Sequence, residues 1–253
     1  MKIAQRLDQR KYLVRDSWLT EVFNHDAYRL CIDERFMQKI EKEMVDFFRE
    51  LQERPCFLYA KVPTGQIWAA KFLESLRFNL IDTEIVLEKP VNSKPELIGY
   101  STVRFAQPQD REQVGELARR NLKTSRFHLD FSIPSALADR IKQEWALNYF
   151  KGRRGDQMVV AFVDNQIAGF LQLLLKERTI VVDLIATDEP HRQKGIATDM
   201  IAFVESNVNG CTKICVGTQI SNLPSISLYE KLGFRICSSE YVFHYRHLPP
   251  DSE

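Results

Sequence analysis

The chain has 253 residues, of which 44% are hydrophobic and 27% are charged, and its formal net charge is +1 at pH 7. This length allows one large domain or two modest domains with a buried core, and the near-neutral balance argues against a nucleic-acid-binding protein with a broad basic face. No run of about 18 apolar residues is present, so neither a membrane-spanning helix nor a membrane partner is expected, and an N-terminus without an apolar core predicts a cytoplasmic protein.

The first 92 residues predict a small α/β domain. Phe36, Ile40, Met44 and Phe47 recur at steps of three and four residues, which is the spacing of one buried helix face. Pro55 ends this helix, because proline cannot continue a helical hydrogen-bond ladder. The expected elements are a strand over 27–31, a helix over 34–54, a strand over 56–62, a helix over 66–76 and a strand over 81–87.

A polar stretch over 87–99 follows and contains Pro90, Asn92, Ser93 and Pro95. Such a composition is typical of a linker, so we expect a domain boundary here, with domains over 1–92 and 93–253. The alternative is a surface loop inside one continuous domain.

The order of elements changes after this stretch. A strand and two helices come first, and three consecutive strands separated by short polar turns then predict a meander. The expected elements are a strand over 101–105, helices over 108–121 and 135–150, strands over 157–163, 165–175 and 179–186, a helix over 198–207, a strand over 211–218, a helix over 223–232, and a final strand pair over 234–237 and 240–245.

One stretch, 179–198, has the pattern of an anion-binding site. A β-branched strand leads through a turn into Arg192, Gly195 and Ala197, which stand at the start of an amphipathic helix. A glycine lets the main chain approach a ligand closely, and the free N–H groups of a helix start favour an anion. We therefore expect a pyrophosphate to bind there.

A second motif follows the first along the chain. It contains Asn222, Pro224, Tyr229 and Gly233. Together the two motifs resemble the GNAT superfamily of acetyl-CoA-dependent N-acetyltransferases. The resemblance implies an α/β GNAT fold after the small α/β N-terminal domain. This fold has a mixed, mostly antiparallel central sheet in which the strands over 179–186 and 211–218 splay apart. It also implies acetyl-CoA as the acetyl donor.

The resemblance assigns donor-binding roles to two segments and to Asn222. The end of the strand would pair its backbone with the pantetheine arm, and the N–H near Ile185 would polarise the thioester carbonyl. The expected cofactor-binding residues are Leu184, Ile185, Ala186, Thr187, Arg192, Gln193, Lys194, Gly195, Ile196, Ala197, Thr198 and Asn222. Two alternatives stay open: Asn222 caps the helix instead, and Arg192 is a solvated side chain or pairs with Glu189.

For the chemistry, the resemblance makes Tyr229 the general acid that protonates the departing thiolate. Packing of its ring on the helix face is the alternative. Asp183, at the same strand parity as Ile185 and Thr187, would take the amine proton, or else would only bind a cation or a substrate hydroxyl. The identity of the base stays open, because His128 and Asp130 lie on the loop expected to cover the acceptor site, where His128 could also be an ordinary surface histidine. No metal is expected, because five scattered cysteines without a CxxC pair do not make a zinc site.

The acceptor is suggested by a closer resemblance, to bacterial TDP-4-amino-sugar acetyltransferases. It is carried by patches over 60–62, 78–85, 125–127, 143–145 and 217–222. It implies a free amine on a nucleotide-linked sugar, used for surface polysaccharides. Three residues are expected to bind this substrate, Arg126, Phe127 and His128, and the arginine would contact the diphosphate.

Two other functions stay open. One is N-acetylation of a different amine, such as a protein N-terminus, a lysine, a polyamine or an antibiotic. The other is a non-catalytic module that binds acyl-CoA, which the presence of Gly195, Ala197 and Tyr229 disfavours. The resemblance is compatible with a homodimer, and the sequence leaves the oligomeric state, the sugar's stereochemistry and the nucleotide base open.

Overall fold

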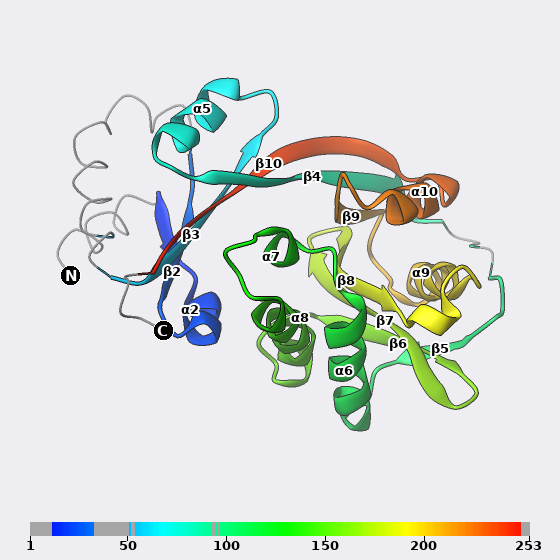
Figure 1. The fold of residues 1–253 in the computed structure, drawn as a ribbon. Helices are drawn as coiled ribbons and strands as arrows, with labels where there is room; N and C mark the ends of the chain where they lie inside the picture. The colour runs from blue at the N-terminus through cyan, green and yellow to red at the C-terminus, as the bar shows by residue number, and fades with distance from the viewer. Residues whose placement is uncertain (1–11, 33–50, 52–53, 93–94, 96, 249–253) are drawn as a thin grey trace. The chain divides into compact units, whose positions relative to one another are not determined.

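The computed structural model describes residues 12–32, 51, 54–92, 95 and 97–248 (Figure 1). Two compact units divide the chain: the first contains Met1–Glu84 and Ser239–Glu253, and the second is Ile85–Ser238. The boundary expected at residue 92 therefore falls inside the second unit, and as a statement about domains it stays a prediction. The helix expected over 34–54 lies almost wholly outside the described residues.

The first unit contains one mixed sheet with the strand order β1-β2-β3-β10-β4. Strands β2 and β3 are parallel, whereas β1 pairs with β2, and β10 with β3, in the antiparallel sense. The elements are β1 (Leu13–Arg15), α2 (Ser17–Phe23), β2 (Asp26–Leu30), β3 (Cys56–Pro63), α5 (Ile67–Ser75), the first part of β4 (Asn79–Pro90) and the last part of β10 (Arg235–His247).

The core of the first unit follows from alternation along β3. Leu58, Ala60 and Val62 have no exposed surface and belong to one apolar cluster with Ala69 and Leu73 of α5. The buried side chains that alternate along β3 therefore pack against the apolar side of α5.

The sequence analysis missed β1 and α2. Both are short, and α2 depends on a local contact, since the Asp16 side chain accepts a hydrogen bond from the Leu19 backbone N–H at 2.9 Å. Capping of this kind stabilises a helix whose seven residues carry little propensity of their own.

The second unit contains a sheet with the strand order β10-β4-β9-β8-β7-β6-β5. Its strands β6, β7 and β8 form the expected antiparallel meander, β5 pairs with β6 in the antiparallel sense, and β8 and β9 are parallel. Besides its parts of β4 and β10 it has β5 (Thr102–Phe105), η1 (Pro108–Asp110), α6 (Arg111–Asn121), α7 (Arg126–Leu129), α8 (Ser135–Phe150), β6 (Gln157–Val163), β7 (Gln166–Lys176), β8 (Thr179–Thr187), η2 (Glu189–His191), α9 (Ile196–Asn207), β9 (Lys213–Gln219) and α10 (Leu223–Lys231).

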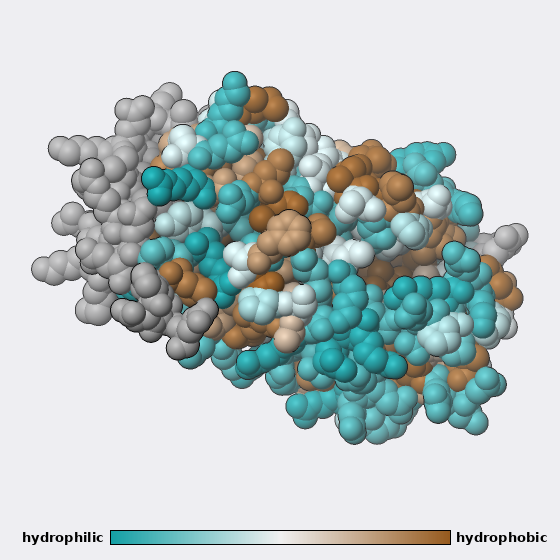
Figure 2. All heavy atoms as spheres, viewed as in Figure 1, coloured by the Kyte–Doolittle hydropathy of each residue, from teal (hydrophilic) through white to brown (hydrophobic). Residues whose placement is uncertain are grey.

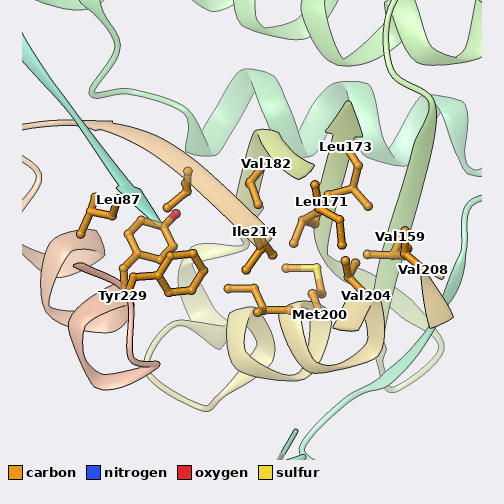
Figure 3. Close-up of a cluster of buried hydrophobic side chains, with 14 of the residues drawn as sticks. Leu87, Val159, Leu171, Leu173, Val182, Met200, Val204, Val208, Ile214 and Tyr229 are labelled. Atoms are coloured by element: carbon orange, nitrogen blue, oxygen red, sulfur yellow. The ribbon is translucent and has the colours of Figure 1, made fainter. Parts of the chain in front are cut away.

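Helices cover both faces of this sheet. On one face α6 and α8 pack on Met158, Val160 and Phe170, and Figure 2 shows that the outward surface of α6 is hydrophilic. On the other face α9 and α10 pack on Leu171 and Leu173 (Figure 3). Phe170 and Leu171 are neighbours on β7, so the faces alternate residue by residue.

Two details of the second unit bear on the predictions. The hairpin between β6 and β7 turns at Asp164 and Asn165, with φ of 50° and 63°, values that asparagine and aspartate tolerate better than most residues. The prediction of two separate final strands was wrong, because β10 is one continuous strand over Arg235–His247.

None of the helices that the structure describes has the length and apolar content that a membrane crossing needs.

Candidate functional site

Strand β8 changes its pairing at Asp183. On one side its parallel ladder with β9 ends at Val182 and Val216, although β8 continues to Thr187 and β9 to Gln219. The edge of β8 from Asp183 onward is therefore unpaired on this side, with backbone N–H and C=O groups able to bond a ligand. This is the divergence of the two strands that the sequence predicted.

On its other side β8 carries a β-bulge at the same residue. The register with β7 passes from Leu173–Val182 to Gln172–Leu184, so Asp183 is the extra residue. A bulge reverses the alternation of side chains. Accordingly, Val182 belongs to the α9–α10 cluster and Leu184 to the α6–α8 cluster.

The bulge corrects one prediction. Asp183 contacts Trp145 of α8, whereas Ile185 packs on the α9–α10 cluster. The two side chains therefore lie on opposite faces of the sheet, and their expected shared parity was wrong. A regular period of two does not hold across a bulge.

Beyond β8 the segment predicted to hold an anion, here called the cradle loop (residues 188–198), leads into α9. Gln193 and Gly195 have φ of 62° and 94°, and α9 begins at Ile196. The first amide groups of α9 have no partner within the helix and lie at the positive end of its dipole, which suits an anion. The four neighbouring strand residues Leu184, Ile185, Ala186 and Thr187 lead directly into it, and Arg192, Lys194, Ala197 and Thr198 complete the segment.

A second segment, which contains Ile98, packs against the start of α9. A Cβ placed on Gly195 would lie 2.7 Å from Ile98, so the glycine is required by this contact as well as by its φ. The buried Asp199 carboxylate of α9 accepts hydrogen bonds from the backbone N–H groups of Ile98, Gly99 and Ser101 and from the Ser101 hydroxyl. The sequence analysis missed this anchor, whose only signal was an acidic residue in the first helical turn.

The Arg192 side chain binds the end of α6. Its Nη2 donates to Asn121 Oδ1 at 2.9 Å, while Asn121 Nδ2 donates to Asp188 Oδ1 at 3.0 Å. The expected pair with Glu189 is not among the ion pairs of the described residues. Arg192 thus ties the cradle loop to α6.

The Asp183 carboxylate is bound by four donor groups. Arg154 donates from Nε at 2.7 Å and from Nη2 at 2.5 Å, Trp145 Nε1 donates at 2.9 Å, and Gln172 Nε2 donates at 2.9 Å. The side chain of Asp183 is only 6% exposed. Three of these donors bond Oδ2 and one bonds Oδ1, so the carboxylate is held mainly by Arg154. In the structure this carboxylate forms an ion pair with Arg154, and its role in catalysis stays a prediction.

Gln172 adds an unusual feature beneath this network. It has no exposed surface, and its Oε1 accepts no hydrogen bond from a described residue. A Cβ on Gly155 would lie 3.0 Å from the Gln172 side chain, so the segment that carries Arg154 packs directly on this glutamine. Sequence reasoning missed Arg154 and Gln172, because their roles depend on contacts between distant segments.

Tyr229 lies on α10, within the same apolar cluster as Ile196 at the start of α9. Its side chain is 3% exposed, its ring centroid is 5.5 Å from that of Phe234, and burial raises the pKa of its phenol above the ordinary value. Figure 3 shows it beside Leu87, with the hydroxyl pointing away from α10. The Tyr229 ring is therefore packed in the apolar cluster, and its hydroxyl stays protonated.

Asn222 stands at the N-cap position of α10, yet its side chain does not cap the helix. Instead Nδ2 donates to Thr218 Oγ1 on β9 at 3.1 Å. The neighbouring apolar residues Ile220 and Leu223 are 46% and 68% exposed. The capping alternative therefore holds for the position of Asn222 and not for its side chain.

The three expected substrate residues form α7. The Arg126 guanidinium lies 4.4 Å from the centroid of the Phe127 ring, and Phe127 has no exposed surface. His128 bonds Ser125 and Asp139, and burial lowers its pKa. Only Arg126 and His128 of this trio retain surface that a ligand can touch.

The comparisons with known proteins agree with this geometry. Residues 122–234 match the acetyltransferase (GNAT) family. An N-alpha-acetyltransferase of Saccharolobus solfataricus is 30% identical over 149 residues, covering 53% of this chain and 80% of that protein. The spore coat polysaccharide biosynthesis protein SpsD of Bacillus subtilis is 27% identical over 200 residues, covering 78% of this chain and 68% of that protein. The dTDP-fucosamine acetyltransferase of Escherichia coli O6:H1 is 25% identical over 184 residues, covering 72% and 78%.

The matched segment contains the features described above. It includes the bulged strand β8, the cradle that opens α9, and Tyr229 on α10. Strands that diverge and free amide groups at a helix start suit the binding of acetyl-CoA. The chain covers 80% of the length of a relative that is named an N-alpha-acetyltransferase. The chain belongs to the GNAT family of N-acetyltransferases.

Proposed function

We propose that the chain transfers the acetyl group of acetyl-CoA to the free amine of a TDP-linked amino sugar, for surface polysaccharide synthesis. The observation that carries the donor half is the unpaired edge of β8, which ends in an anion cradle. Two relatives support the acceptor half, one named for spore coat polysaccharide biosynthesis and one for dTDP-fucosamine acetylation.

The residues fit the donor. Acetyl-CoA supplies a pyrophosphate, a pantetheine arm with two amides, and a reactive thioester. Amide groups over 193–198 would hold the pyrophosphate, and the free edge of β8 over 184–187 would pair with the pantetheine amides. The φ of 94° and the close contact with Ile98 both require glycine at 195.

The chain's own groups would then assist a direct attack. The Ile185 N–H would donate to the thioester oxygen as negative charge develops there. Tyr229 would give its proton to the departing thiolate, since burial keeps the phenol protonated. Because amine and thioester are held together, no acyl-enzyme is needed.

The acceptor would meet α7. Arg126 is suited to the sugar's diphosphate, because a guanidinium binds phosphate oxygens in a bidentate manner. Phe127 has no exposed surface, so in this proposal it supports the Arg126 side chain that lies over its ring. Asp183 would fix Arg154 and Trp145 at the bulge.

A protein N-terminus is the second candidate acceptor. It is favoured by the N-alpha-acetyltransferase relative, which has the highest identity of the three. That alignment covers 149 residues, whereas the alignments with the two sugar-related proteins cover 200 and 184 residues and cannot fit within residues 93–253 alone. Similarity that extends into the first 92 residues favours the sugar acceptor.

A thiol-release assay tests this choice. The full chain with acetyl-CoA would be offered TDP- and UDP-linked amino sugars, peptides with a free N-terminus, and polyamines. We expect the highest kcat/KM with a TDP-linked amino sugar, and no release with the same sugar already N-acetylated. Turnover of peptides alone would contradict the sugar proposal, and absence of acetyl-CoA binding in calorimetry would contradict the donor assignment.

A further inference from the structure

Three side chains at α7 and α8 are hydrogen-bonded in series. Ser125 Oγ lies 2.7 Å from His128 Nδ1, and His128 Nε2 lies 3.0 Å from Asp139 Oδ1. A serine, a histidine and a carboxylate in this order form a path along which a proton can move.

The bond partners assign the proton positions. The carboxylate of Asp139 only accepts, because its pKa lies below the ordinary value through its hydrogen bonds with Lys123 and His128, against the effect of burial. His128 Nε2 therefore carries a hydrogen, and its Nδ1 lone pair accepts the hydroxyl proton of Ser125.

His128 is suited to accept a proton. Burial lowers its pKa, and the cations Lys123 and Lys142 lower it further, while the bond to Asp139 opposes them. Lys123 itself binds the same oxygen of Asp139 at 2.5 Å. The imidazole is therefore neutral near pH 7, and Asp139 stabilises it once it is protonated.

Ser125 has an unused acceptor site. It occupies the N-cap position of α7, where a serine hydroxyl ordinarily accepts a hydrogen bond from a backbone N–H, but here it makes no capping bond. Its proton points to His128, and no described residue donates to Oγ. The oxygen can therefore accept a hydrogen bond from a ligand.

Two contacts limit how far this series lies from β8 and from the loop that leads into α9. Ser125 follows Asn121, the partner of Arg192 in the cradle loop, by four residues, which span at most about 14 Å. Asp139 precedes Trp145, the partner of Asp183 at the bulge, by six residues of α8, or about 9 Å along the helix.

We propose that Ser125 and His128 take the proton that the acceptor amine loses, with Asp139 as the positioning residue. This proposal rests on the proposed acetyl transfer to an amine. Asp183 is less suited to the same task, because its carboxylate is paired with the Arg154 guanidinium and also accepts hydrogen bonds from Trp145 and Gln172.

The step balances. The amine nitrogen attacks the thioester carbon, the C–N bond forms, the C–S bond breaks, and the thiolate takes the Tyr229 proton. The ammonium proton passes to Ser125 Oγ while the Ser125 proton passes to His128 Nδ1. The imidazolium then releases its proton to solvent, which also reprotonates Tyr229.

Matched variants test the series in the full chain. Ser125→Ala removes the hydroxyl and Ser125→Thr keeps it. We expect kcat to fall about 100-fold in the first and to stay within about fivefold in the second. Ser125→Ala combined with His128→Gln should be no slower than either alone, and acetyl-CoA affinity by calorimetry should be unchanged in all three.

The pH profile separates proton transfer from a merely structural role. Asp139→Asn removes the charge that favours the imidazolium, so the acidic limb of kcat/KM should move to lower pH. An unchanged limb, or a wild-type kcat in Ser125→Ala, would overturn the proposal.

NMR of ¹⁵N-labelled protein tests the hydrogen-bonded series independently of which acceptor the enzyme uses. It should show the Nε2-protonated tautomer of His128 without any acceptor, and the Nδ1-protonated tautomer would refute the series. If only peptides are acetylated, the sugar proposal fails and the same variants are measured on the peptide.

Discussion

At Tyr229, burial determines what the phenol can do. The residue is 3% exposed, and its pKa lies above the ordinary value of a tyrosine because burial disfavours the phenolate. Its hydroxyl makes no hydrogen bond to a described residue. The group is thus a proton donor across the neutral and mildly alkaline range, and its hydroxyl contributes little to folding.

These properties separate activity from stability in Tyr229→Phe. We expect kcat to fall about 100-fold, because the thiolate loses its acid, while the melting temperature changes by no more than a few degrees. Thiol release and calorimetry measure the two effects. Tyr28→Phe, a change at another buried tyrosine, should leave kcat unchanged, and a wild-type rate in Tyr229→Phe would remove the acid assignment.

Asp82 on β4 is a buried carboxyl group in the first unit. It is 9% exposed, its Oδ2 has no hydrogen-bond partner among the described residues, and burial raises its pKa to about 6, with the nearby Glu84 adding to the effect. The folded chain therefore holds this proton more tightly than the unfolded chain. Its contribution to stability is complete below pH 4 and is lost as the pH rises through 6.

Asp82→Asn should remove that loss. We expect the free energy of unfolding to rise by about 1–3 kcal/mol at pH 7.5, because a shift of one pKa unit corresponds to about 1.4 kcal/mol. At pH 4 the variant should gain much less, since Asp82 is then largely protonated in the folded wild type and only partly ionised in the unfolded chain. Urea titrations at the two pH values measure this, and an equal gain at both would contradict the assigned pKa.

Among the elements, long periodic segments were predictable. The helix expected over 135–150 is α8, and the strand expected over 157–163 is β6, each with the predicted ends. The helix is one long segment without glycine, and the strand is a continuous apolar run whose residues 158–161 are all buried, so both can be recognised within one segment. The turn at Asp164 and Asn165 was predictable for the same reason, because these residues favour it locally.

The bulge at Asp183 was not predictable. It exists because β8 pairs with β7 in two registers, one on each side of Asp183, and a single strand's sequence does not record its partner's register. The same limit hid the hydrogen bonds of Asp183 with Arg154 and Gln172. The loop with positive φ and the helix start at 193–196 were thus predictable because they depend on one segment, and the partners of Asp183 were missed because they come from several.

The cradle loop permits a test at the level of an element. In Gly195→Ala the new methyl group would meet Ile98 at 2.7 Å, at a φ of +94°. We expect a loss of about 2–3 kcal/mol in stability and an acetyl-CoA affinity at least tenfold lower by calorimetry, because the amides over 193–198 lose their arrangement.

Gly210→Ala is the matched control for backbone strain. Gly210 has a φ of +82°, and no described atom lies within 4 Å of the position that its new methyl group would take. This variant should lose only about 1–2 kcal/mol and should bind acetyl-CoA as the wild type does. Equal affinity in both variants would mean that Gly195 has no part in donor binding.

For the molecule as a whole, the two units repeat one order of elements. In the first unit the parallel pair β2–β3 is followed by α5 and the long strand β4, and in the second the parallel pair β8–β9 is followed by α10 and the long strand β10. The same order of elements can be built from different apolar residues, because a core tolerates exchange of apolar side chains when volume and pattern are kept.

Each long strand also serves both units. Residues 85–90 of β4 belong to the second unit, and residues 239–247 of β10 belong to the first. A polar, proline-containing stretch in a sequence predicts an exposed segment. It does not reveal in which compact unit the preceding strand packs. This explains why the compact units divide at Glu84 while the sequence pointed to residue 92.

Two fragments of the second unit test how much it depends on β4. A fragment over 85–238 keeps Ile85 and Leu87, which are 2% and 0% exposed, and also Lys89, whose Nζ lies 3.0 Å from the buried Glu205 carboxylate. A fragment over 93–238 lacks all three residues. It loses about 1.5–3 kcal/mol for each apolar side chain, and about 3–5 kcal/mol more because Glu205 stays buried without its cation.

The expected result is a folded fragment over 85–238 and an unfolded or aggregated fragment over 93–238, because the losses together match the whole stability of a domain, about 5–15 kcal/mol. Near-ultraviolet circular dichroism and thermal unfolding distinguish the outcomes. Removal of β4 also exposes the edge of β9, which favours aggregation. Equal stability of the two fragments would show that residues 93–238 fold independently of β4, as a domain boundary at residue 92 requires.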